Sequence, residues 1–494
     1  MKERIAIIDF GARYNQLIAE AVLNCGVYAE LLPPDASVER IKGDCLSGLI
    51  LSGCYDSVYA PGSRNCTDGI FSLGVPILGI CYGMQLISHK LGGKVEPAPV
   101  KEFGRTFVRF DRDRLFEGIP DSVMWMYHND WVGSIPEGFN IIAETDGCPH
   151  GAISCETRGI YAVQFHPEVK HSEYGQKLFE NFVLGICGCK GGMTFEMLAD
   201  ELASGIADRV GPHRIAAPLS CGIDSITAAA LAKRAVGDRL ICLFIDHGLY
   251  RENEPAELMA LFSDAGLNTV YVDACQSFSN KLNGACSIKQ KRERFSEEYA
   301  RILQNEASKL GAEFLLQATC MHDMFDEPDA SVILKTPNNA NGIEPDSTFK
   351  GILEPLNGRI RHETLSLAKA LGLPAKLISR MPLPPAGMAE LFCGALDANS
   401  LQTLRKAEHI ISEELANNGV FDMISRCYAS LIEHRGTAGL SCHTLVLRAV
   451  KHTEEMTVEC VELPFKLLTE LGLKLKRALP EVSRVVYDFT PDKI

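Results

Sequence analysis

The segment that most restricts the fold of this chain is residues 218–225, which read Pro-Leu-Ser-Cys-Gly-Ile-Asp-Ser. A short apolar run precedes it at residues 215–217, and an alanine-rich run follows at residues 226–233. This order predicts a strand, a tight polar loop and a helix. Such a loop directs backbone N–H groups and the positive end of a helix dipole into one small volume, which suits an anion. The sequence therefore favours an α/β domain with a phosphate site at this loop.

The side chains of the loop extend this interpretation. Ser220 and Ser225 place hydroxyl donors at its two ends, and Asp224 adds a carboxylate. Because that carboxylate would repel a bare phosphate, we expect a Mg²⁺ ion between the two, with Asp224 as its ligand. The alternative is an ordinary helix N-cap formed by Ser220 or Ser225.

The spacing resembles the S-G-G-x-D-S pyrophosphate loop of the ATP pyrophosphatase (PP-loop) enzymes, which adenylate an oxygen and release pyrophosphate. It does not match the G-x-x-x-x-G-K-[ST] loop of kinases and GTPases. Cys221 stands where the family has its first glycine, which adds a side chain close to the expected ligand. The resemblance implies that ATP is a substrate and that its pyrophosphate is bound by Ser220, Gly222, Asp224 and Ser225.

The first third of the chain has the pattern of an α/β domain with a largely parallel sheet. Buried-strand runs recur at residues 5–8, 46–51, 75–80 and 159–165, and a helical stretch lies at residues 14–24. In open sheets of this kind, functional residues gather at the carboxyl ends of the strands.

Two of those strand ends carry reactive side chains. Cys81 lies in a turn flanked by Gly79 and Gly83, which is the arrangement of a nucleophile elbow with cysteine in place of serine. The helix expected after the turn favours the thiolate form of such a cysteine. His166 ends a later run, and Glu168 stands two residues on, where it can orient and charge-stabilise the imidazole. Taken singly, a buried core cysteine and a satisfied strand-end histidine are the simpler alternatives.

Together these motifs resemble the G-x-C-x-G and H-P-E elements of class I glutamine amidotransferases, in the same order and at a similar separation. Segments 9–11, 51–53 and 102–104 also match that family. The resemblance implies that Cys81 attacks the amide carbon of glutamine and that His166 transfers the proton to the departing ammonia. Glu168 would hold His166 in place.

The same resemblance implies an oxyanion site built from backbone N–H groups, those of Tyr82 and of the Gly53 turn. Cys54 stands where the family usually has a second glycine. The backbone N–H after Gly53 remains available as a donor, but the direction in which it points does not follow from the sequence.

A glycine-rich stretch at residues 185–192 is the linker expected after this first domain. Beyond the pyrophosphate loop, the strand ending in Asp246 resembles the F-V-D-N-G-L-L-R segment of GMP synthetases, whose strand edge holds adenine. Gln317 and Asp323 fall on the Q-G-T element of the same family. The resemblance implies that Asp246 binds ATP and that Gln317 and Asp323 contribute to the acceptor site.

The resemblance weakens where GMP synthetases bind their acceptor, xanthosine monophosphate. The family's K-S-H-H-N-V-G-G is Lys-Thr-Pro-Asn-Asn-Ala-Asn-Gly at residues 335–342, so both histidines are absent while Lys335 and Asn339 remain. Lys335 would neutralise phosphate charge during adenyl transfer, and Asn339 would contact the acceptor. A solvated lysine at a loop start is the alternative for Lys335.

Two further acceptor-side features differ from the family. Its H-P-F-P-G-P-G segment is Met-Pro-Leu-Pro-Pro-Ala-Gly at residues 381–387, and its C-terminal T-I-E-W-E is missing beyond Lys493. Lys493 is the remaining candidate acceptor ligand at that end. Because each charged hydrogen bond contributes roughly 1.5–3 kcal/mol, these changes predict poor binding of xanthosine monophosphate with ATP binding retained.

The C-terminal part reads as a small α+β unit. A helix is expected around residues 400–417 and another at 464–479, with strands at 444–450, 457–461 and 484–488. The unit resembles the dimerisation domain of GMP synthetases, which implies a homodimer.

The length of 494 residues suggests roughly three domains. We expect a flavodoxin-like class I amidotransferase domain at 1–188, an adenine-nucleotide α-hydrolase-like (PP-loop) domain at 193–380 and the α+β dimerisation domain at 381–494. The net charge of −14 argues against a nucleic-acid surface, and no apolar run approaches the ~20 residues of a membrane span. The 18 scattered cysteines indicate reduced thiols, so a cytoplasmic protein is expected.

The resemblances together imply a carbon–nitrogen ligase of GMP synthetase type. Glutamine would supply ammonia, and ATP with Mg²⁺ would adenylate a purine nucleotide acceptor. Two alternatives stay open, namely a paralogue that aminates a different, modified purine-like acceptor and a non-catalytic regulator that binds nucleotide. The presence of both reactive motifs counts against the regulator.

Overall fold

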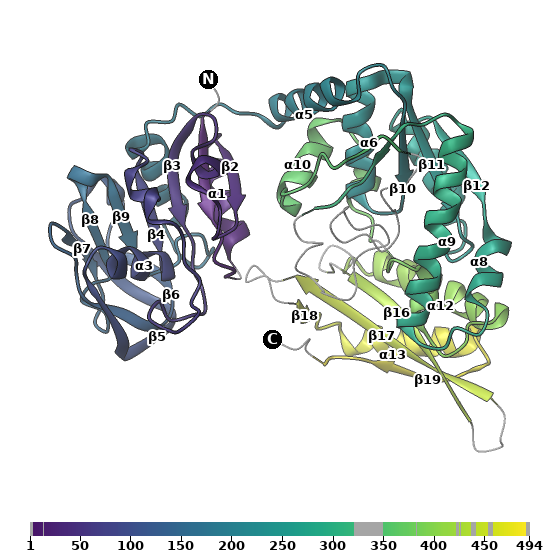
Figure 1. The fold of residues 1–494 in the computed structure, drawn as a ribbon. Coiled ribbons are helices and arrows are strands. Elements are labelled where there is room, and N and C mark those ends of the chain that lie inside the picture. Colours follow the sequence, from purple (N-terminus) through teal and green to yellow (C-terminus); the bar gives the residue numbers. More distant parts are fainter. Residues whose placement is uncertain are drawn as a thin grey trace. The chain divides into compact units, whose positions relative to one another are not determined.

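The computed structural model describes residues 3–12, 14–320, 349–381, 383–420, 424, 426–435, 441–452 and 458–490. The described chain divides into two compact units, with the boundary between Thr194 and Phe195. That boundary follows the glycine-rich stretch at residues 185–192. Figure 1 draws the helices and strands of both units, coloured along the sequence.

The first unit contains a nine-stranded sheet in the order β2-β1-β3-β4-β9-β8-β7-β5-β6. Its strands are β1 (Arg4–Ile8), β2 (Tyr28–Leu32), β3 (Leu46–Leu51), β4 (Ile77–Ile80), β5 (Lys94–Phe110), β6 (Ser122–Ser134), β7 (Asn140–Glu144), β8 (Ala152–Cys155) and β9 (Ile160–Val163). Its α-helices are α1 (Asn15–Asn24), α2 (Val38–Lys42), α3 (Tyr82–Lys90) and α4 (Gly175–Glu180), and a π-helix follows at Asn181–Ile186.

The prediction of a largely parallel sheet holds for only half of this sheet. The neighbouring pairs from β2 to β9 are parallel, whereas those from β9 through β8, β7 and β5 to β6 are antiparallel. The antiparallel half has a physical cause, because no α-helix lies between β5 and β9 to make the crossover that parallel strands need. Strands β1, β4 and β9 of the parallel half are buried at every position, and so is β8, the first strand of the antiparallel half.

The second unit begins with α5 (Phe195–Val210) and contains a five-stranded sheet in the order β12-β11-β10-β13-β14, all of whose pairs are parallel. The strands are β10 (Ile215–Leu219), β11 (Leu240–Asp246), β12 (Thr269–Asp273), β13 (Phe314–Leu316) and β14 (Gly351–Leu353). The helices that follow are α6 (Ile223–Val236), α7 (Glu254–Asp264), α8 (Cys275–Leu282), α9 (Ile288–Lys309), α10 (Arg361–Ala370) and α11 (Ala375–Ile378).

The strand order reverses direction at β10, because the chain runs from β10 outward to β12 and then returns to β13 on the other side. Ligands of open parallel sheets bind at the carboxyl ends of the strands beside such a reversal. The predicted pyrophosphate loop directly follows β10, so the topology places it at that position. The core of this sheet lies against α8 and α9, where Phe278, Phe295 and Leu303 pack on Leu243 and Leu315.

A second five-stranded sheet of this unit lies in the C-terminal part. It contains β15 (Phe392–Cys393), β16 (Arg426–Arg435), β17 (Ser441–His452), β18 (Val458–Cys460) and β19 (Val482–Tyr487), with α12 (Ala398–Asn417) and α13 (Phe465–Ala478). The sequence predicted the two helices and three of the five strands, and it missed β15 and β16. Figure 1 shows this sheet and its helices inside the second unit. The division at residue 380 into a separate C-terminal domain stays a prediction.

Candidate active sites

The turn that carries Cys81 has the strained backbone of a nucleophile elbow. Cys81 lies between β4 and α3 with φ +51° and ψ −104°, a conformation that non-glycine residues rarely adopt. A Cβ at Gly79 would lie 2.7 Å from the carbonyl carbon of Gly83, and a Cβ at Gly83 would overlap the carbonyl oxygen of Leu51. Both glycines are therefore required for the strand and the helix to meet this closely.

His166 and Glu168 follow β9 and form a buried pair. The Nδ1 atom of His166 lies 2.8 Å from Oε1 of Glu168, and the two side chains are 4% and 1% exposed. Backbone bonds fix the loop, since the His166 amide donates to the carbonyl of Trp125 at 2.8 Å. Burial opposes a charge on His166, but the Glu168 carboxylate and the Cys81 thiol outweigh it and raise the pKa of the imidazole to about 10. The geometry therefore favours an imidazolium beside the nucleophile.

Gly53 connects this pair to the nucleophile. A Cβ at Gly53 would lie 3.2 Å from Cε1 of His166 and 4.0 Å from Cβ of Cys81. Tyr82 is the first residue of α3, where backbone N–H groups have no partner within the helix. The structure thus brings together Gly53, Cys81, Tyr82, His166 and Glu168, all five residues that the sequence analysis assigned to glutamine hydrolysis.

Two residues that the sequence analysis missed contact the thiol. The side-chain amide of Gln164 donates to Sγ of Cys81 at 3.6 Å, and the thiol lies 3.6 Å from the carbonyl oxygen of Tyr127. Gln85 in turn donates to Gln164 at 3.3 Å. The spacing held a partial signal, because Gln164 stands two residues before His166, directly after β9, and Gln85 stands one helical turn after Cys81.

Glu102, part of a segment that matched the amidotransferase family, lies in a buried cluster with His128 and Cys148. Their potential ligand atoms lie within 4.8 Å of one another. Nε2 of His128 lies 3.2 Å from Glu102, while its Nδ1 lies 3.1 Å from the carbonyl of Asp130. The contact between His128 and Glu102 therefore joins β6 to β5.

The predicted pyrophosphate loop is closed by its two serines. The hydroxyl oxygens of Ser220 and Ser225 lie 2.9 Å apart, and the Ser220 amide donates to Ser225 Oγ at 3.1 Å. The N-cap of α6 is Gly222, which makes no side-chain capping bond, and the Ser225 hydroxyl donates to its carbonyl at 3.0 Å. The structure therefore disfavours the alternative of an ordinary serine N-cap. Asp224 lies in the first turn of α6.

Cys221, which replaces a family glycine, does not project into the loop. The residue is 8% exposed, and its thiol lies near Leu383 and the carboxylate of Glu254. Burial raises the pKa of this thiol, and Glu254 raises it further, so the side chain stays neutral. The extra side chain is accommodated in the protein interior rather than in the anion site.

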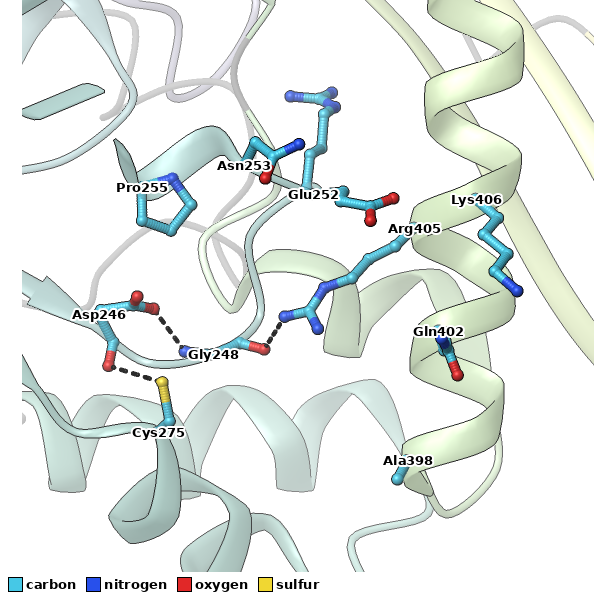
Figure 2. A pocket seen from close by; sticks show the side chains of 11 residues that line it. Asp246, Gly248, Glu252, Asn253, Pro255, Cys275, Ala398, Gln402, Arg405 and Lys406 are labelled. Carbon is cyan, nitrogen blue, oxygen red and sulfur yellow. Dashed lines mark hydrogen bonds between the residues drawn. The ribbon is translucent and has the colours of Figure 1, made fainter. Parts of the chain in front are cut away.

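Asp246 ends β11, the parallel neighbour of β10. Its carboxylate accepts hydrogen bonds from the Gly248 amide at 2.9 Å and from the Tyr271 hydroxyl at 2.6 Å. A cavity of about 440 Å³ lies beside this strand end. Figure 2 shows residues that line it, from Asp246, from the loop between Gly248 and Asn253 and from α12. In that view Arg405 of α12 reaches the loop and donates to the Gly248 carbonyl at 2.6 Å.

The predicted acceptor residues are only partly described. Gln317 follows β13 and is 4% exposed, and neither its side-chain oxygen nor its nitrogen has a hydrogen-bond partner among the described residues. A buried, unsatisfied amide at a strand end suits a ligand that completes its bonds. The other predicted residues of this part of the site, Asp323, Lys335, Asn339 and Lys493, lie outside the described residues.

Comparisons with known proteins extend this picture over the whole chain. The family described as "Glutamine amidotransferase class-I" matches residues 6–186, and "GMP synthase C terminal domain" matches residues 413–493. Curated relatives named "GMP synthase [glutamine-hydrolyzing]" from Clostridium botulinum and Clostridium perfringens are 39% and 38% identical, each over 99% of this chain and 98% of the relative. A solved glutamine amidotransferase from Thermotoga maritima is 16% identical with a TM-score of 0.34, covering 38% of this chain and 100% of its own.

Proposed function

Because this chain belongs to the family of glutamine-hydrolysing GMP synthases, we propose that it aminates xanthosine monophosphate with ammonia from glutamine and energy from ATP. The observation that carries the proposal is the presence of two reactive loops in one chain that resembles these relatives from end to end. The first loop holds Cys81 beside His166, and the second holds the paired serines of residues 220–225. The chain is accordingly a glutamine-dependent ligase.

We assign glutamine hydrolysis to the first unit. Cys81 attacks the amide carbon, and the oxyanion that forms accepts hydrogen bonds from the backbone amides of Gly53 and Tyr82. His166 gives its proton to the departing ammonia, and water then releases glutamate from the thioester. Glu168 keeps Nδ1 of His166 protonated through the 2.8 Å contact, which leaves Nε2 to exchange the proton.

We assign adenylation to the carboxyl edge of the parallel sheet in the second unit. The loop of Ser220, Gly222 and Ser225 offers hydroxyl and backbone donors to the pyrophosphate of ATP, and the first turn of α6 adds its helix dipole. The carboxylate of Asp224 suits a Mg²⁺ ion, which would neutralise phosphate charge when bound. Asp246 at the next strand end would face the adenosine part of ATP.

The chemistry explains why two sites are needed. The carbonyl oxygen at position 2 of the acceptor base is a poor leaving group until it carries an adenylyl group. Its attack on ATP releases pyrophosphate, and displacement by ammonia then releases AMP and a proton. Gln317, whose side-chain amide is buried and unsatisfied among the described residues, is our candidate for contact with the acceptor, as are Asp323, Lys335, Asn339 and Lys493 from the sequence.

We further propose a homodimer formed through the C-terminal sheet. Alternate residues of β16 and β17, such as Ala429, Leu431, Leu445 and Leu447, are buried on the face that α12 and α13 cover. The opposite face includes Ile432 and Val486, which are 40% and 43% exposed. Burial of this half-apolar face against a second copy would remove it from water. A change of Ile432 to Glu should then shift the molar mass in solution from dimer to monomer.

The proposed reaction also suggests where the protein works and which molecules it binds. Among the described residues, none of the helices combines the length and apolar character needed to cross a membrane. We propose that the protein works in the cytoplasm, where glutamine, ATP and nucleotides are available, and that it has no nucleic-acid partner.

A direct assay tests the proposed function. Purified protein is incubated with glutamine, ATP, Mg²⁺ and xanthosine monophosphate, and the nucleotides are separated by liquid chromatography. The proposal predicts GMP, AMP, pyrophosphate and glutamate in equal amounts. A protein that hydrolyses glutamine but forms AMP only with a different purine-like acceptor would favour the paralogue, and a protein that catalyses neither reaction would favour the regulator.

A further inference from the structure

A buried ion network lies beside the pyrophosphate loop and is not used by the chemistry described above. Its centre is Glu254, the first residue of α7, whose side chain is 1% exposed. One carboxylate oxygen accepts from Arg380 at 2.5 Å and lies 3.4 Å from the guanidinium of Arg251. The other oxygen accepts from the backbone amide of Arg251 at 2.9 Å. Glu254 thus bridges two arginines far apart in the sequence.

The network continues from Arg251 into the C-terminal sheet. Nε of Arg251 donates to Glu408 on α12 at 3.2 Å, and Glu408 accepts from the Ala429 amide on β16 at 2.6 Å. Arg251 also donates to the carbonyl of Met381 at 3.2 Å. Two buried carboxylates and two guanidinium groups therefore balance in charge, and they tie the loop after β11 to residues 380–381.

Residues 380–381 and 383–388, which we call the strap, lie in the proline segment predicted to face the acceptor. The strap is held at its far end too, because the Met388 amide donates to the Leu249 carbonyl at 2.9 Å. Gly387 has φ +58°, and a Cβ there would lie 2.6 Å from the same carbonyl oxygen. The Ala386 amide donates to Glu390 at 2.8 Å. Both ends of the strap are therefore fixed to the loop that follows Asp246.

Packing alone does not explain this arrangement. Well-packed apolar side chains hold two segments together at least as strongly as a buried ion pair, whose charges must be desolvated. Charged groups add directional hydrogen bonds, because a guanidinium can bind its carboxylate in only a few orientations. Such bonds fix the position of one segment relative to the other. A defined position is of use under the proposed function, because the strap is the segment predicted to face the acceptor and the loop after β11 follows Asp246, the predicted ATP ligand.

We infer that Glu254 is a positioning residue that sets the strap, and through it the acceptor, against the adenylation site. This inference rests on the proposed function for the identity of the acceptor. It makes two claims, that loss of the Glu254 charge releases the strap and that the released strap binds the acceptor more weakly. Glutamine hydrolysis belongs to the first unit and does not depend on the network.

The chain offers a matched control. Glu257, one turn along α7, lies 3.6 Å from the other terminal nitrogen of Arg380, but its side chain is 61% exposed. Glu254→Gln and Glu257→Gln therefore remove the same charge from partners of the same arginine, one buried and one in solvent. Glu254→Asp keeps the charge and serves as the conservative variant.

The first measurement is steady-state amination of xanthosine monophosphate with ammonium chloride in place of glutamine, followed by pyrophosphate release. Because each charged hydrogen bond lost corresponds to roughly tenfold or more in affinity, Glu254→Gln should raise the acceptor KM at least about tenfold, with a smaller change in kcat. Glu254→Asp should recover part of the loss, and Glu257→Gln should match the wild type. An unchanged KM in folded Glu254→Gln, or an equal rise in Glu257→Gln, overturns the inference.

The second measurement is independent of the substrate. Hydrogen exchange of the full chain should show faster exchange at the Gly387 and Met388 amides in Glu254→Gln and wild-type rates in Glu257→Gln. If Glu254→Gln does not fold, Arg380→Lys replaces it in both measurements. Lysine keeps the positive charge but lacks the planar guanidinium and its paired N–H donors. Unchanged exchange in the strap overturns the inference even if xanthosine monophosphate proves not to be a substrate. Failure of the wild-type protein to aminate it would refute the proposed function alone.

Discussion

Replacement of Glu168 by Gln is the perturbation that isolates the proton chemistry of the first unit. Gln keeps the shape of the side chain but removes the charge that lies 2.8 Å from Nδ1 of His166, in a pair whose side chains are only 4% and 1% exposed. Loss of one partner from a buried pair costs about 3–5 kcal/mol. At 1.36 kcal/mol for each tenfold change in rate, kcat for glutamine hydrolysis should fall by roughly 10²–10⁴.

The same variant should change the pH dependence of stability. The pKa of His166 is raised to about 10, above its ordinary value of 6.5, through Glu168 and Cys81 acting against burial. A raised pKa contributes stability that is fully present below pH 6.5 and is lost as the pH rises through about 10. Thermal unfolding of the wild type should therefore show a decline over that window, and the decline should be shallower in Glu168→Gln.

The assay is glutamate release at saturating glutamine, with ammonia-dependent amination measured on the same preparation. Retained use of ammonia would show that the second unit is folded and that the loss is confined to glutamine hydrolysis. A kcat within tenfold of the wild type would refute the reasoning, because His166 would then not depend on its buried carboxylate.

The remaining predictions concern the two reactive loops and the acceptor. Cys81→Ala should abolish glutamine-driven amination and leave amination with added ammonium salt, both followed by AMP formation; equal loss of both activities would contradict independent sites. Asp224→Asn should remove synthesis with either nitrogen donor while basal glutamine hydrolysis persists, since the expected Mg²⁺ ligand is lost, and wild-type synthesis would exclude the pyrophosphate-loop assignment. Gly83→Ala should destabilise the first unit by about 1–3 kcal/mol in denaturant unfolding, because a Cβ there overlaps Leu51 O. The KM for xanthosine monophosphate should exceed that of the Clostridium botulinum relative assayed in parallel, because two histidines of the family motif are absent at residues 337–338; equal values would show that other groups replace them.

The parts of the molecule that the sequence predicted are those governed by local chemistry. The strand, turn and helix around Cys81 were readable because Gly79 and Gly83 permit a turn that other residues cannot make. The position of His166 followed from a short buried strand whose end must lie at the same sheet edge. Each signal lies within a few residues of the side chain that it places.

The parts that were missed depend on contacts between distant segments. The antiparallel half of the first sheet follows from the lack of crossover helices, which periodicity does not reveal. The side-chain amide of Gln164 acquires a role only once β9 and the elbow are neighbours. The inward direction of Cys221 depends on Leu383 and Glu254, from the strap and α7.

Transfer of labelled nitrogen tests the central claim most directly. The protein is incubated with glutamine labelled with ¹⁵N at the side-chain amide, together with ATP, Mg²⁺, xanthosine monophosphate and unlabelled ammonium at low concentration. The account predicts GMP that carries ¹⁵N on its exocyclic amine, with one AMP and one pyrophosphate formed for each glutamate released. Glutamate release without formation of GMP, or GMP whose exocyclic amine is unlabelled because it came from free ammonium, would contradict it.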